Sequence, residues 1–208
     1  MAKYGILKSA VNNGLESELI SVFIAPLTIE SKKISLISET MGMVRRGTYS
    51  DNQRWEVTCG MRPNNDAEMF AQQVVAGFSD SFHIRMPQLM SKKKIISNIV
   101  FSADKAYSGG TSSVDLAGGG GVSLPVGHFI KFSGHDKVYM VTASSYSNGL
   151  NTVRLTPKLR KAIVAGERIT YGANVTMRVL YGDNAPTAIS YTDGILSRYD
   201  SLQFVEAL

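Results

Sequence analysis

The sequence is short of the residues from which metal, redox and disulfide sites are built. Cys59 is its single cysteine, so no disulfide can form within the chain and no cysteine pair can hold a metal or exchange electrons. The three histidines, His83, His128 and His135, do not stand at metal-ligand spacings from one another, from the cysteine or from a glutamate. We therefore predict no metal site, no cofactor and a buried, inert thiol at Cys59, which shares an alternating apolar run with Trp55.

Arrangements on which catalysis depends are missing too. No Gly-x-Ser-x-Gly elbow occurs to present a nucleophile, and the carboxylates stand apart, with Glu16 and Glu18 nearest to a pair. The glycines at 118–121 are not followed by Gly-Lys-Ser/Thr or by a helix start, so they predict a flexible or close-packed loop rather than a phosphate site. At His135-Asp136 we expect an aspartate that stabilises a tight turn beside an exposed histidine. We predict no enzyme and no catalytic residues.

Long hydrophobic runs are absent. The first residues do not combine a basic region with an apolar one, and the Ser-Lys-Lys of residues 31–33 interrupts the apolar sequence well short of a membrane span. We expect no signal peptide, no transmembrane helix and no membrane partner, and a chain that folds in a cytoplasm.

What the sequence does contain is the composition of a globular protein. It has 208 residues, of which 44% are hydrophobic and 19% charged, enough for one sizeable domain or two small ones. Its net charge of +5 gathers in short, scattered groups at residues 45–46, 92–94 and 158–161. We interpret these groups as solvated turns and strand ends, with nucleic-acid binding as the alternative.

Period-two alternation dominates the chain. It predicts short strands at residues 34–38, 42–46, 53–60, 82–86, 95–101, 129–133, 137–143, 151–156, 175–181 and 199–205, with a weaker segment at 189–195. Residues 47–52 should be the loop of a hairpin, and Asn148-Gly149 a tight hairpin turn. One helix is predicted at 67–78, and one or two helical turns at 159–164. Residues 15–25 fit a strand or a short helix equally well.

One clear helix among about ten short strands indicates a barrel or a sandwich. The most economical layout is a mainly β fold in two parts. Residues 1–93 and 173–208 form a split β-barrel or sandwich with one helix, and residues 94–172 form an inserted small β-barrel. Four aromatic residues of the insert, Phe129, Phe132, Tyr139 and Tyr146, lie near lysines. We expect core packing for them, with base stacking as the alternative.

Three segments of the insert carry a resemblance to a known family. They are residues 126–132 (VGHFIKF), 135–141 (HDKVYMV) and 153–159 (VRLTPKL), followed by residues 177–183 (MRVLYGD) and 201–208 (SLQFVEAL). Together they resemble the distal tail proteins, or baseplate hubs, of long-tailed bacteriophages. In that family the first three segments belong to an insert with an oligonucleotide/oligosaccharide-binding (OB) fold, and the last two to the hub domain.

The resemblance implies a structural virion protein located at the tail tip. Such a hub forms a homohexameric ring at the distal end of the tail tube, joins the tube protein to baseplate hub or fibre proteins, and leaves a channel through which DNA passes without specific binding. Loops at residues 47–52 and 182–186 are candidates for contacts between subunits. The alternatives are another tail-tube or baseplate component, a module that binds single-stranded nucleic acid, and an insert that binds carbohydrate.

Overall fold

The computed structural model describes residues 4–7, 19–39, 45–61, 68, 81–86, 99–172, 175–182, 190–196 and 199–208. These residues form a mainly β structure with two large antiparallel sheets, which confirms the predicted fold class at that level. The predicted helix at 67–78 lies outside the described residues apart from Glu68, which is helical.

The first sheet is a closed barrel. Its strands follow the order β1 (Tyr4–Leu7), β2 (Leu19–Glu39), β3 (Arg45–Met61), β14 (Tyr199–Glu206), β11 (Thr176–Tyr181) and β4 (Phe82–Arg85), with β4 returning to β1. Every pairing is antiparallel. The segment at 15–25, which the sequence left open between strand and helix, is a strand from Leu19 onward.

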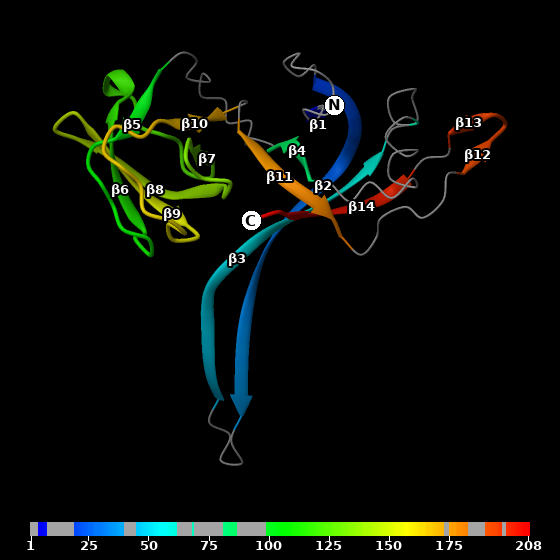
Figure 1. Ribbon diagram of the computed structural model, residues 1–208, viewed down its shortest axis with the longest axis horizontal. Coiled ribbons are helices and arrows are strands. Elements are labelled where there is room, and N and C mark those ends of the chain that lie inside the picture. Colours follow the sequence, from blue (N-terminus) through cyan, green and yellow to red (C-terminus); the bar gives the residue numbers. More distant parts are fainter. Residues whose placement is uncertain are drawn as a thin grey trace.

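The second sheet lies beside the barrel (Figure 1). Its order is β10 (Ile169–Tyr171), β7 (Phe129–Phe132), β8 (Tyr139–Ser147), β9 (Leu150–Thr156), β6 (Ser113–Gly118) and β5 (Phe101–Ala103). A single bridge between Ser102 and Arg168 joins its two ends, so the sheet curls round on itself. A short 3-10 turn, η1 (Gly119–Gly121), follows β6, and β12 (Tyr191–Thr192) with β13 (Ile195–Leu196) makes a separate hairpin. The chain therefore leaves the barrel after β4 and returns to it with β11. We call the second sheet, which is formed by β5 to β10, the inserted sheet.

Each sheet has its own core. Residues in and next to β3, β4 and β11 fill the barrel at the alternate positions that the sequence predicted: Trp55, Val57, Cys59, Phe82, Ile84, Met86, Val175, Met177 and Val179. Leu202 and Phe204 of β14, whose inward face was not assigned from the sequence, join them. Phe129 of β7 and Val138, which directly precedes β8, complete this core. Cys59 is buried as predicted, and burial raises the pKa of its thiol to about 12, so the reactive thiolate does not form near neutral pH.

A long two-stranded ribbon corrects the predicted hairpin. Residues 47–52 belong to β3, which pairs with β2 as far as Glu39↔Arg45, and Figure 1 shows this ribbon projecting away from the barrel. The predicted pairing of 42–46 with 53–60 is wrong, because β3 pairs with β2 on one side and β14 on the other. The polar run that suggested a loop becomes an irregularity between Lys33↔Gln53 and Ser35↔Tyr49. Pairing with a long neighbouring strand here outweighs local turn propensity.

Several other elements differ from the sequence predictions. The strand expected at 95–101 begins at Phe101, and β1, β6 and β10 were not predicted. Residues 159–164 form no helical turn, because their backbone bonds reach across to residues 107–111: Leu159 donates to Thr111, and Ile163 and Tyr107 exchange two bonds. Leu159 and Ile163 are four residues apart, which suggested a helix. Both are instead buried in the core of the inserted sheet by a segment that is not helical. The Asn148-Gly149 turn is confirmed, with positive φ at both residues.

The glycine run is close-packed at one end and open at the other. A Cβ on Gly118 would lie 2.2 Å from the Val100 carbonyl oxygen, whereas one on Gly120 would meet nothing within 4 Å; both residues have positive φ. We expect Gly118→Ala to lower the free energy of unfolding by more than about 3 kcal/mol, because backbone strain adds to a clash that β5 cannot relieve. Gly120→Ala should cost only about 1 kcal/mol from its left-handed φ. Urea unfolding of both variants tests this; equal losses would show that the run is not packed.

Candidate functional site

A buried ion pair joins the inserted sheet to the barrel. Lys137, just before β8, bonds to Glu206 at the end of β14, and their side chains are 3% and 0% exposed. The Glu206 carboxylate also accepts the backbone N–H of Trp55 and of Val138, each at 3.0 Å. All its oxygens thus have donors, which an ion pair needs in order to offset the loss of hydration.

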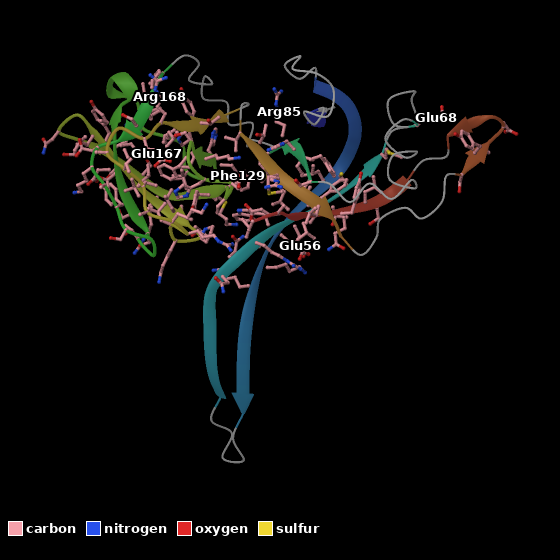
Figure 2. The ribbon with its side chains drawn as sticks, viewed as in Figure 1. Glu56, Glu68, Arg85, Phe129, Glu167 and Arg168 are labelled. Carbon is pink, nitrogen blue, oxygen red and sulfur yellow. The ribbon has the colours of Figure 1, made fainter. Side chains whose placement is uncertain are left out.

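Aromatic contacts seal this pair from solvent. The Trp55 indole donates to the Val138 carbonyl at 2.8 Å, and the Lys137 ammonium lies 5.7 Å from the centre of the Trp55 ring. Phe129 packs edge-on against Trp55 at 5.4 Å, and Figure 2 shows it where the inserted sheet meets the barrel. We call Trp55, Phe129, Lys137, Val138 and Glu206 the junction cluster. Burial lowers the pKa of Lys137 to about 8, outweighing the opposing attraction of Glu206, so the ammonium persists at neutral pH.

Next to the cluster lies a buried histidine, which corrects the expectation of an exposed one. His135 is 4% exposed; its Nδ1 is 2.8 Å from the Tyr139 hydroxyl, which accepts the N–H of Arg160 at 3.1 Å. The Ala162 carbonyl, which can only accept, lies 3.5 Å from Nε2, so the neutral ring carries its proton on Nε2 and accepts the Tyr139 hydroxyl at Nδ1. Burial lowers the pKa of His135 and favours this neutral form. Ring contacts with Phe132 and Tyr139 explain the burial, which an adjacent aspartate in a turn did not signal.

A cavity of about 200 Å³ opens beside the junction cluster. Eight residues from both sheets line it: Asn52, Gln53, Gly110, Lys137, Pro157, Lys158, Leu159 and Arg160. Gln53 is 4% exposed, and neither atom of its side-chain amide has a hydrogen-bond partner in the described part of the protein. We call this the junction cavity. A smaller hollow, bounded by His135 and Leu208 among others, shares Lys137 and Arg160 with it.

The residues that the sequence analysis named as candidates differ in burial. Phe129, Phe132 and Tyr139 are buried, as the core interpretation predicted, while Tyr146 is 43% exposed. The basic residues of 158–161 are exposed and line the two hollows, whereas 92–94 lies outside the described residues. Within the described ranges, no three His, Cys, Asp or Glu side chains are grouped as a metal site would need, and no helix has the length and apolarity to span a membrane.

Sequence reasoning missed the residues that matter most at this site. Glu206 stands at an inward position of its strand, two residues beyond the buried Phe204, and Lys137 precedes the buried Val138 and Tyr139. A charge at an inward strand position is the one signal that could have been read, since such a charge is retained only when it is paired. No protein-family model and no curated protein matches the chain.

The ion pair gives a first test at the junction. We expect Lys137→Met to lower the free energy of unfolding by about 3–5 kcal/mol, because the Glu206 carboxylate would stay buried without its counter-charge. Lys32→Met is the control: Lys32 is half exposed, its nearer partner Glu30 is half exposed too, and the buried Glu56, 4.0 Å away, keeps Arg54 as a counter-charge, so the loss should be under about 1 kcal/mol. Urea unfolding compares the two. Equal effects would contradict a buried, coupled pair.

The neutral histidine gives a second test, on pH dependence. Burial lowers the pKa of His135 below its usual 6.5, so below that pH the unfolded chain binds a proton that the folded protein does not, and stability falls. His135→Gln should be about 1–2 kcal/mol less stable than wild type at about pH 7.5, through lost packing and a weaker bond to Tyr139. That gap should narrow at about pH 5. The burial-lowered pKa values of His83 and His128 are common to both proteins and cancel in the difference. A constant gap would show that His135 does not titrate differently on folding.

Proposed function

We propose that this protein is a structural virion component that forms a homohexameric ring at the distal end of a phage tail tube and links the tube to baseplate or fibre proteins. The segments that resemble distal tail proteins correspond to β7, β8 and β9 in the inserted sheet and to β11 and β14 in the barrel. We also propose that the barrel is the hub domain, with the predicted bounds 1–93 and 173–208, and that residues 94–172 form an OB-like insert. The curled sheet and its Ser102–Arg168 bridge support that assignment.

The observation that carries the assembly proposal is the β2–β3 ribbon. From Lys33↔Gln53 to Glu39↔Arg45 the two strands pair with each other, and no third strand of the described chain pairs with this stretch. An isolated two-stranded ribbon is marginally stable in water, and its free edges are ready to pair with another chain. A neighbouring copy that covers the ribbon would supply the missing contacts, and repetition of this contact about a rotation axis makes a ring.

The ribbon includes one of the two regions that the sequence predicted to contact other subunits. Residues 47–52 take part in the proposed interface as strand rather than as loop. Of the second region, 182–186, only Gly182 lies in the described chain. The nucleic-acid alternative keeps only Tyr146 of its four aromatics on the surface, which is too few for a stacking platform.

Replacing the ribbon tests the assembly. Residues 34–52 are exchanged for Asn-Gly, which joins Lys33 to its partner Gln53 through a two-residue turn. Light scattering should give wild type a mass of about six times the 22.6 kDa chain, and the variant the mass of one chain. Far-ultraviolet circular dichroism checks that the variant stays folded. A monomeric wild type at high concentration, or a ribbonless ring, would contradict the proposal.

Location in the particle separates the hub from the alternative tail component. Antibody-gold labelling of isolated tails should mark the tip furthest from the capsid. Labelling along the whole tube would assign the protein to the tube itself, and unlabelled tails would remove it from the virion.

A further inference from the structure

We propose that the junction cavity is a binding site for an acidic polypeptide segment, which places a glutamate or aspartate side chain and one of its peptide groups between β3 and the inserted sheet. The inference goes beyond the ring proposal and does not depend on it, because every residue it uses belongs to one chain.

The side-chain amide of Gln53 lacks hydrogen-bond partners. Gln53 lines the cavity and is only 4% exposed, yet both the oxygen and the nitrogen of its amide lack a partner among the described residues. Leaving a buried donor and acceptor unmet costs about 1–3 kcal/mol each, so such groups call for explanation. A peptide group has one donor and one acceptor and can satisfy both atoms at once.

Charge is the second argument. Lys137, Lys158 and Arg160 line the cavity, and the Lys137 charge is already balanced by Glu206. The Arg160 guanidinium makes no hydrogen bond or ion pair within the described residues; only its backbone N–H is used, toward Tyr139. A guanidinium beside a cavity favours a carboxylate, which it binds with two parallel hydrogen bonds.

Size and chemistry narrow the ligand. The volume of about 200 Å³ is below the range of about 300–1,000 Å³ usual for whole cofactors, and suits a single side chain with its peptide group. The doubly ionised phosphate of a monoester has only acceptor oxygens, so it would satisfy the cations and the Gln53 N–H₂ but leave the Gln53 carbonyl oxygen without a donor. Inorganic phosphate keeps an O–H donor at neutral pH, so the competition experiment below tests it directly. Gln53, which needs both a donor and an acceptor, and Arg160, which needs an anion, lie beside one cavity. Together they favour a ligand that carries a carboxylate on a peptide.

The test titrates the full-length protein with N-acetyl-glutamate N-methylamide, observed by saturation-transfer NMR of the probe. We expect binding, with at least about tenfold weaker binding of the neutral N-acetyl-glutamine N-methylamide, because one charge-assisted bond is lost. Gln53→Leu and Arg160→Gln should each weaken binding of the glutamate probe about tenfold. Arg154→Gln, which removes an exposed charge on β9 away from the cavity lining, should leave binding unchanged.

Gln53→Leu also reports on folding. It removes two unmet polar atoms at similar volume, so its stability to urea should equal or exceed that of wild type, and a loss of binding cannot then be attributed to unfolding. The proposal is overturned if the glutamate probe fails to bind or binds both site variants as well as wild type. It is also overturned if inorganic phosphate displaces the probe, or if N-acetylneuraminic acid binds more tightly, which would assign the cavity to phosphate or to an acidic sugar.

Discussion

The arrangement of the two sheets depends on one desolvated carboxylate. Glu206 ends the last strand of the barrel, and it binds the ammonium of Lys137 together with the backbone N–H groups of Trp55 and Val138. These donors come from both sheets, so the carboxylate is satisfied only when the inserted sheet is docked. Trp55 adds a bond to the Val138 carbonyl and covers the pair, which leaves the insert little freedom to rotate on the barrel.

This docking makes one core out of two segments that the chain separates. Phe129 belongs to β7 of the inserted sheet and Val138 directly precedes β8, yet both pack in the core of the barrel. The inserted sheet in turn keeps an independent core around Phe101, Phe132 and Tyr139. An insert that was joined to the barrel only by its two connecting segments would not bury apolar side chains in the barrel core. The junction is therefore built as a fixed interface, and any surface formed across it has a defined shape.

Features that depend on neighbouring residues could be predicted from the sequence, whereas features that depend on residues distant in the sequence could not. Alternation in Trp55-Val57-Cys59 and in Val175-Met177-Val179 predicted both strands and their buried faces, because period-two burial is written in neighbouring residues. The division into a split barrel and an insert remains a prediction, supported by the sheet order. The predictions of a loop at residues 47–52 and of helical turns at 159–164 were wrong because the backbone of each segment bonds to partners distant in sequence. These partners are β2 and residues 107–111. Glu206, Lys137 and Gln53 were missed for the same reason: their roles exist only across the junction.

The ribbon and the junction cavity meet at one residue. Gln53 pairs with Lys33 where the ribbon leaves the barrel, and its side chain lines the cavity beside the insert. A group bound there would touch the base of the ribbon and the fixed insert together. Because the insert is locked by Glu206, such a ligand would restrain the ribbon rather than move the insert. Restraint of a marginal two-stranded element lowers the entropy cost of its later pairing with another chain, so occupancy of the cavity and assembly through the ribbon would favour each other.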